Sequence, residues 1–211
     1  MNMTIAVILV FVVSYLLGCF NGAVLISKRI FQDDVRTHGS GNAGLTNFYR
    51  TYGARYALLV IACDMGKCAI ATAIGGCLFR HFYQDWTLGV LVAGLACIVG
   101  HVFPAFYGFK GGKGILAGSI LVIMLDWRMA LVAWGLFVLA VALTRYISLG
   151  SITAASSVAV SAFFVYDRPL YIVLAVVIAA LVVWSHRSNI VRLVKGNENK
   201  FKFHVDPPEK K

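Results

Sequence analysis

The run TIAVILVFVVSYLLGCFNGAVLI, from Thr4 to Ile26, contains 23 residues and no charged side chain. A helix needs about 20 apolar residues to cross the ~30 Å hydrocarbon core of a bilayer, so this run predicts a transmembrane helix. The sequence Leu16–Cys19 resembles a lipoprotein cleavage site, but no Lys or Arg precedes the run and apolar residues resume at Ala23. We therefore expect this helix to be retained.

The rest of the chain has the same character. Of its 211 residues, 60% are hydrophobic and 13% charged, and the mean hydropathy of +0.80 is far from that of a soluble domain. With no linker-like segment or internal repeat, residues 1–211 are expected to form one domain, an all-α bundle of seven transmembrane helices. The run 114–125 is short for a span, and a re-entrant pair over 114–143 remains an alternative. The expected spans are 4–26, 56–79, 86–106, 114–125, 129–143, 149–166 and 170–184.

The positive charges support an odd number of spans. With seven spans and the N-terminus outside, 15 of the 19 Lys and Arg residues lie on one side, 3 lie on the other, and Lys67 lies within a span. The positive-inside rule places the basic side in the cytoplasm. Fusing 114–143 into a single span would move the basic tail to the other side. The basic side carries Lys28, Arg29, Arg36, Arg50, Arg55, Lys110, Lys113, Arg145, Arg187, Arg192, Lys195, Lys200, Lys202, Lys210 and Lys211, and the other side carries Arg80, Arg128 and Arg168.

We interpret the net charge of +10 as serving the attraction of the protein to anionic membrane lipids and to anionic substrates. The cations are juxtamembrane and no aromatic-interleaved basic fold is present, so nucleic acid is excluded as a partner. The nine acidic residues are scattered, and the cysteines lie in apolar runs without a Cys-x-x-Cys pair. We therefore expect no metal and no cofactor. The cysteines are Cys19, Cys63, Cys68, Cys77 and Cys97.

Three polar motifs interrupt the apolar sequence, all on the basic side. The first, GSGNAGLTN, covers residues 39–47 and is followed by Arg50. Glycines free backbone N–H groups, and short hydroxyl and amide side chains supply compact donors, which is what a phosphate requires. A helix cap would need only one such residue, so we favour a binding loop over a simple turn. Its candidate site residues are Ser40, Gly41, Asn42, Thr46, Asn47 and Arg50.

The second motif is GHVFP at residues 100–104, followed by GFKGGKG at 108–114. Its glycine spacing is not that of a Walker loop. A flexible cationic loop before a helix N-terminus suits phosphate, whereas a basic membrane anchor would explain the lysines and not the glycines. The candidates here are His101, Lys110, Gly111, Gly112 and Lys113.

The third motif, HRSN at 186–189, continues to Arg192 and Glu198, with an apolar face that predicts a short interfacial helix on the cytoplasmic surface. His186 alone is explained equally well by a polar cap and by a functional role, and the polar residues beside it favour the functional role. The cytoplasmic loop 144–151 adds Ser148 and Ser151 as further phosphate contacts.

Asp64 and Lys67 lie three residues apart inside the second expected span, where ionised side chains are seldom incidental. Support of the site is the favoured role for this pair, and substrate binding is the alternative. An ion-coupled transporter of a phosphorylated metabolite would also use such a pair. In a transporter, however, polar groups gather at mid-membrane on broken helices, whereas these motifs gather at one interface.

The three motifs, with their spacing between apolar runs, resemble those of the bacterial acyl-phosphate:glycerol-3-phosphate acyltransferases, the PlsY family, over nearly the whole chain. The resemblance implies a multi-pass enzyme of the bacterial plasma (inner) membrane. It would move a fatty acyl group from acyl phosphate to the sn-1 hydroxyl of glycerol 3-phosphate, giving lysophosphatidic acid, the first acylation of phospholipid synthesis. The enzyme that makes acyl phosphate is a candidate partner. No His is followed by Asp at the spacing of the His-x4-Asp acyltransferases.

The chemistry of that reaction suits these residues. Arg50, Lys110, Lys113 and Arg192 can bind two phosphates, and Ser40, Asn42, Asn189 or glycine N–H groups can stabilise the carbonyl oxyanion. Without a Ser-His-Asp arrangement or a Gly-x-Ser-x-Gly elbow, direct transfer is simpler than an acyl-enzyme. The base is His101, His186 or the substrate phosphate, and the sequence does not rank these. The catalytic candidates are therefore Ser40, His101, His186 and Asn189, with Asp64, Lys67 and Glu198 in support.

Overall fold

The computed structural model describes residues 1–201, so Lys202, Lys210 and Lys211 of the basic tail lie outside the described residues. This part of the chain is all helical and contains no strand. Its α-helices are α1 (Met3–Cys19), α2 (Gly22–Ile30), α3 (Leu45–Tyr52), α4 (Ala57–Tyr83), α5 (Trp86–Val102), α6 (Ile115–Leu125), α7 (Trp127–Thr144), α8 (Ile147–Val165), α9 (Pro169–Ser185) and α10 (Arg187–Val194), with 3-10 turns η1 (Val35–Thr37) and η2 (Ala105–Tyr107).

Each expected span coincides with one helix, except the first, which covers α1 and part of α2. This agreement confirms the all-helical membrane class. Within the described residues, five elements are long and apolar enough to cross a membrane, or six if the bent pair of α9 and α10 is one span. Helix α6 has only 11 residues, so the count of seven spans stays a prediction. The bend between α9 and α10 is 58°, and the interfacial position of α10 also stays a prediction. The five elements are Met3–Ile30, Ala57–Tyr83, Trp86–Tyr107, Trp127–Thr144 and Ile147–Val165.

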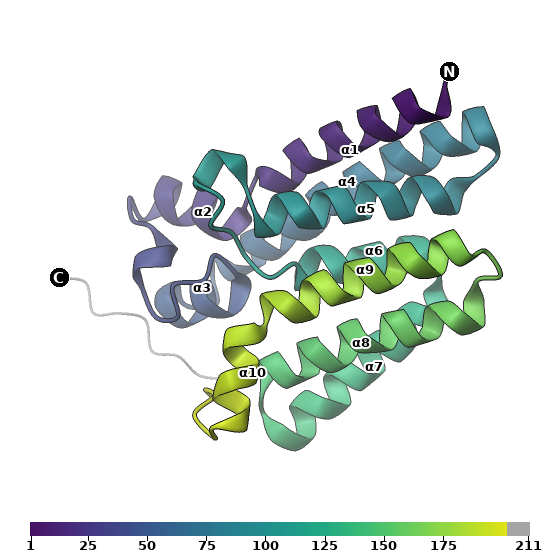
Figure 1. Cartoon of the computed structure of the whole chain (residues 1–211). Helices are drawn as coiled ribbons and strands as arrows, with labels where there is room; N and C mark the ends of the chain where they lie inside the picture. Colours follow the sequence, from purple (N-terminus) through teal and green to yellow (C-terminus); the bar gives the residue numbers. More distant parts are fainter. Residues whose placement is uncertain (202–211) are drawn as a thin grey trace.

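The helices form three layers. Figure 1 shows α1, α4 and α5 on one side, α7 and α8 on the other, and α6 and α9 between them. Helix α5 is largely buried, and a Cβ at Gly100 would collide with the α1 backbone, so a glycine there allows the two helices to pack closely. Apolar side chains on the outer helices point outward, as lipid-facing residues do; Phe164 on α8 is 85% exposed.

The first expected span is not one uninterrupted helix. Helix α1 ends at Cys19 and α2 begins at Gly22, where the side chain of Asn21 accepts a hydrogen bond from the Val24 N–H at 3.0 Å. Helix α4 supplies partners for the backbone groups freed by this break. The Asp64 carboxylate accepts from the Gly22 N–H at 3.1 Å, and the Lys67 ammonium donates to the carbonyls of Gly18 and Phe20 at 3.0 and 2.7 Å. The buried pair therefore supports the break.

The short helices α2, α3 and α10 lie at one end of the bundle (Figure 1). At this end, α2, η1 and α3 pack around a small separate core that contains the fully buried Val35 and Phe48. The turns between α4 and α5, α6 and α7, and α8 and α9 lie at the opposite end. Of the three predicted external arginines, Arg168 lies in such a turn, and Arg80 and Arg128 lie in the helical turns next to one. All three polar motifs thus lie at the basic end.

Candidate functional site

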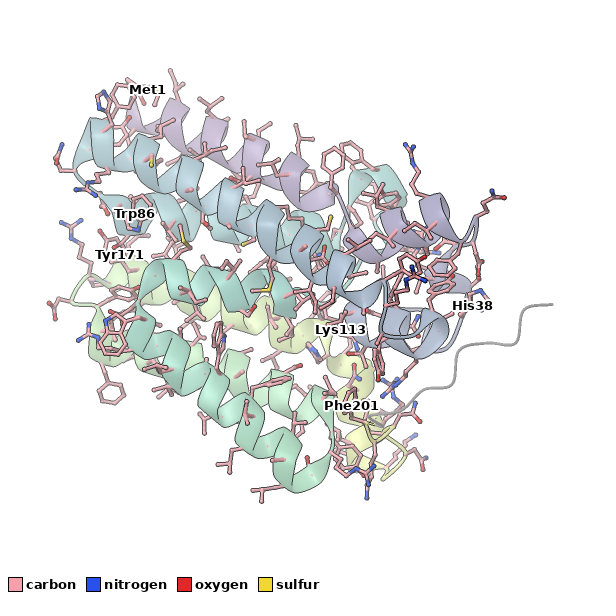
Figure 2. The ribbon with its side chains drawn as sticks, turned by 180° about the vertical axis from the view of Figure 1, so that it is seen from behind. Met1, His38, Trp86, Lys113, Tyr171 and Phe201 are labelled. Atoms are coloured by element: carbon pink, nitrogen blue, oxygen red, sulfur yellow. The ribbon has the colours of Figure 1, made fainter. Side chains whose placement is uncertain are left out.

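The three polar motifs meet around one cavity of about 450 Å³ at the basic end of the bundle. In Figure 2, Met1, Trp86 and Tyr171 lie at one end of the molecule and His38 and Phe201 at the other. Most of the sequence-predicted site residues line this cavity. They are Ser40, Asn42, Thr46, Asn47, Arg50, Asp64, His101, Lys113, Ser148, Ser151, His186, Asn189, Arg192 and Glu198.

The first motif is a loop held in shape by Asn47. The side-chain oxygen of Asn47 accepts from the Ser40 N–H at 3.0 Å, and its amide donates to the carbonyls of Val35 and His38 at 2.9 and 3.0 Å. Both N–H bonds of the Asn47 side chain are therefore used within the loop. Asn21 adds a bond to the Ala43 carbonyl at 3.0 Å, which ties the loop to α2.

The second motif folds back over the end of α5. The Gly112 N–H donates to the carbonyl of His101 at 3.0 Å. A Cβ at Gly112 would collide with the His101 ring and would lie 2.7 Å from the Ala43 carbonyl, so only glycine fits between these two motifs. The glycine is therefore needed for the shape of the loop. A basic membrane anchor would explain the lysines of this motif but not its glycines.

Four predicted binding residues are not among those that line the cavity: Gly41, Lys110, Gly111 and Gly112. Gly111 and Gly112 instead pair with the end of α5 through their N–H groups. Lys110 is exposed, and its carbonyl accepts from Arg36 at 3.2 Å. The structure therefore places Lys113, and not Lys110, against the cavity.

Lys113 is one of three cations that line the cavity, with Arg50 and Arg192. Its ammonium donates to the side-chain oxygen of Asn189. Burial, reinforced by the neighbouring guanidinium of Arg192, lowers the pKa of Lys113 to about 8. Burial also lowers the pKa of Arg50. Desolvated cations of this kind favour an incoming anion, which would offset their unfavourable burial.

Glu198 is an acidic side chain that lies beside the cations of the cavity, and it binds three predicted site residues. Its carboxylate accepts from Ser148, Asn189 and Arg192, each at 2.7 Å. Burial acts to raise the pKa of Glu198, but these hydrogen bonds, led by that of Asn189, outweigh it and lower the pKa. Glu198 therefore holds the side chains of Ser148, Asn189 and Arg192 in place.

The two histidines differ in which ring nitrogen is free. Nδ1 of His186 lies 2.8 Å from the carbonyl of Val182, and because a carbonyl only accepts, Nδ1 must donate. Burial lowers the pKa of His186 to about 4, so its ring is neutral at pH 7 and its lone pair is on Nε2. In His101, Nδ1 lies 2.9 Å from the Lys67 ammonium, which occupies that lone pair. This arrangement favours His186 over His101 as a proton acceptor.

The C-terminal segment 196–201 closes the outer side of the cavity. Within this segment, Glu198 alone was a predicted site residue. The carbonyl of Asn199 accepts from Arg50 at 3.3 Å, and the backbone N–H of Phe201 donates to the carbonyl of Arg145 at 2.7 Å. Asn199, Phe201 and Tyr49 line the cavity as well. A polar tail carries no periodic signal by which its contacts could be predicted.

An apolar groove of about 310 Å³ continues from the polar cavity between α6, α7, α8 and α9. The two share a boundary at Gly114, Ile115, Leu116 and Phe137. The groove is lined by apolar and small side chains, in contrast to the three cations of the cavity. An anionic head group and an alkyl chain of one molecule could therefore be held together here.

A membrane-spanning helical bundle with a cation-lined cavity that opens into an apolar groove defines a class of integral membrane proteins that act on lipid-like molecules with anionic head groups. Comparison with known families narrows this class. The glycerol-3-phosphate acyltransferase family matches residues 8–196, and the chain belongs to this family, that of PlsY. It is thus a membrane acyltransferase.

Relatives and solved structures agree with this assignment. The glycerol-3-phosphate acyltransferases of Prochlorococcus marinus (strain MIT 9215) and Shouchella clausii are 38% and 39% identical, over 92% and 94% of this chain and 96% and 97% of their own. Two crystal structures of PlsY, an integral membrane glycerol 3-phosphate acyltransferase, are similar to the structure of this chain. One is the glycerol 3-phosphate form and the other is the lysophosphatidic acid form. Their TM-scores are 0.83 and 0.79 at 33% identity, over 93% of this chain and 96% and 95% of theirs.

Proposed function

We propose that this protein transfers a fatty acyl group from acyl phosphate to the sn-1 hydroxyl of glycerol 3-phosphate, releasing lysophosphatidic acid and phosphate. The observation that carries the proposal is the junction of a cavity lined by Arg50, Lys113 and Arg192 with an apolar groove. Both substrates carry a phosphate, and the donor also carries an alkyl chain. The family and the ligands named for the solved PlsY structures support glycerol 3-phosphate as acceptor and lysophosphatidic acid as product.

In the proposed step, the glycerol hydroxyl oxygen attacks the acyl carbonyl carbon. A carbon–oxygen ester bond forms, and the bond between the carbonyl carbon and the phosphate oxygen breaks with its electron pair leaving on phosphate. The hydroxyl proton passes to the departing phosphate, directly or through Nε2 of His186. Asn189 and Ser40 are positioned as donors to the carbonyl oxyanion, and Arg50, Lys113 and Arg192 as ligands of the phosphates.

The contacts of Asp64 and Lys67 do not favour a transporter. Asp64, although it lines the cavity, is joined with Lys67 to the break between α1 and α2. The three polar motifs gather at one end of the bundle. We place the protein in the plasma (inner) membrane of a bacterium, with the site facing the cytoplasm. The enzyme that makes acyl phosphate remains a proposed partner.

Purified protein in detergent should form lysophosphatidic acid from glycerol 3-phosphate and palmitoyl phosphate, and should not form it from palmitoyl-CoA or palmitoyl carrier protein. Product is measured by mass spectrometry, with and without a chelator. Equal rates with palmitoyl-CoA, or loss of activity on chelation, would contradict the proposal.

The proposed orientation, with the basic end of the bundle in the cytoplasm, predicts that cysteines introduced at this end react only with reagents supplied from the cytoplasmic side. In a background without the five native cysteines, Arg36→Cys, Phe109→Cys and Lys200→Cys should be labelled in inverted vesicles and protected in intact cells. Arg80→Cys is the matched control and should show the reverse pattern. Labelling of position 36, 109 or 200 from outside would overturn the orientation.

The lowered pKa of Lys113 predicts a pH dependence. The charged ammonium, present below about pH 8, binds phosphate, so kcat/KM for glycerol 3-phosphate should fall as the pH rises through about 8. A bound phosphate favours the charged form, so kcat should be less sensitive. In Lys113→Arg the guanidinium stays charged, and the fall near pH 8 should disappear. The same fall in that variant would assign the titration to another group.

A further inference from the structure

The apolar groove runs along α6, away from the polar cavity. Its lining starts at Gly114 and Ile115, on the boundary with the cavity, and extends to Leu125, the last residue of α6. Ten residues of α-helix rise about 15 Å, so the groove follows the bundle axis for roughly that distance. An alkyl chain whose carbonyl lies in the cavity would extend along this direction.

On α7 and α9, Ala133 and Ala175 are the lining residues that lie farthest from the polar cavity, at the deep end of the groove. On α9, Val182 lies one turn before His186, at the cavity end, whereas Ala175 lies seven residues earlier and thus about 10 Å deeper. On α7, Phe137 lies on the boundary with the cavity, and Ala133 lies about one turn deeper.

Ala133 and Ala175 are small side chains among larger ones at the deep end of the groove, such as Leu125 and Val158. Ala133 and Ala175 are only 3% and 1% exposed, so they lie against other parts of the bundle and still leave space at the groove. Packed helix interfaces contain few voids, and a side chain larger than alanine at either position would fill this space.

Beyond the groove, the outer end of the bundle is packed. Met129 and Tyr171 are buried there and do not line the groove. The Tyr171 hydroxyl donates to Asp85 at 2.6 Å, and Arg168 donates to the same carboxylate at 2.9 Å, which joins α5 to the start of α9. The lining of the groove stops short of this layer, at Leu125, Ala133, Val158 and Ala175.

Length discrimination in such a groove must be steric. Lipid tails are as apolar as the groove walls, so a methylene gains little by moving from lipid into the groove. What the groove can do is exclude a chain that would collide with the side chains at its deep end, in the way that specificity arises by repulsion. The residues at the deep end then decide which chains fit.

We propose that Ala133 and Ala175 set the length of the acyl chain that the enzyme accepts. The inference rests on the proposed acyl transfer, with the reacting carbonyl in the polar cavity and the alkyl chain along α6. These two residues lie at a distance from the reacting atoms. They determine specificity because their small side chains leave room in the groove for the far end of the acyl chain.

The test compares kcat/KM for octanoyl phosphate and palmitoyl phosphate at saturating glycerol 3-phosphate. In Ala175→Phe and Ala133→Phe, the ratio of palmitoyl to octanoyl turnover should fall about tenfold or more, with octanoyl turnover retained. Ala180→Phe is the matched control, because Ala180 is exposed on the same helix and does not line the groove. Its ratio should equal that of the wild type.

Octanoyl turnover reports that each variant is folded, so an unchanged ratio in an active Ala175→Phe enzyme would overturn the assignment of this residue. If the phenylalanine variants lose all turnover, Ala175→Val and Ala133→Val carry the same test with a smaller side chain, and an unchanged ratio in both overturns the proposal. Failure of the proposed function looks different: the wild type itself would make no lysophosphatidic acid from either acyl phosphate.

Discussion

Asn189→Ala is expected to lower kcat by about 100-fold or more, and His186→Ala by a similar factor. Asn189 is buried, accepts from Lys113 and donates to Glu198, so its amide is fixed at the junction of the cations and the carboxylate. Alanine would remove a donor to the oxyanion and release Lys113. His186→Ala would remove the ring whose Nε2 can accept the hydroxyl proton.

The alternative for both residues is a purely structural role at the bend between α9 and α10, since His186 bonds the Val182 carbonyl in the last turn of α9. That role predicts lower thermal stability with kcat per folded molecule intact. Measuring both quantities on the same detergent-purified variants separates the two roles. Ser188→Ala is the control, because Ser188 is exposed in the same turn and does not line the cavity.

Arg50→Ala is expected to lose about 2–4 kcal/mol of transition-state stabilisation, much of it as a raised KM for glycerol 3-phosphate. Arg50 lines the cavity, and burial lowers its pKa, so a phosphate bound there would be held by a partly desolvated guanidinium. Arg50→Lys should recover the charge without the bidentate geometry and should give an intermediate KM.

Arg55→Ala provides the comparison for Arg50. Arg55 is exposed, packs over the ring of Tyr56 and does not line the cavity, yet it adds the same charge to the same side of the protein. Its kinetics should be those of the wild type. If Arg50→Ala behaves like Arg55→Ala in steady-state assays, Arg50 contributes to membrane orientation alone.

The helices could be predicted from the sequence because the hydropathy and length of each apolar run are local properties. The break between α1 and α2 could not, because its partners, Asp64 and Lys67, lie more than 40 residues further along the chain. Asn21 was the one local signal, a cap residue inside an apolar run. Its significance depends on what α4 places opposite it.

The motifs that form the site could be predicted from the sequence. The positions of the individual side chains within the site could not, because they depend on how each loop folds. Lys110 and Lys113 are equivalent as letters in GFKGGKG, but the return of this loop over His101 exposes one and directs the other to the cavity. Asn47 likewise matched a phosphate ligand by type, whereas the structure uses both of its amide N–H bonds to hold its own loop. These differences between residues of the same type arise from tertiary structure and cannot be read from the local sequence.

The break between α1 and α2 also has a consequence for biosynthesis. A charged residue at the centre of a helix opposes insertion by the translocon by about 2.5–3.5 kcal/mol, and α4 carries two such residues, Asp64 and Lys67. Their backbone partners at Gly18, Phe20 and Gly22 belong to a segment that leaves the ribosome before α4. We therefore expect α1 and the start of α2 to assist the insertion of α4, and a chain that lacks α1 to leave α4 outside the bilayer.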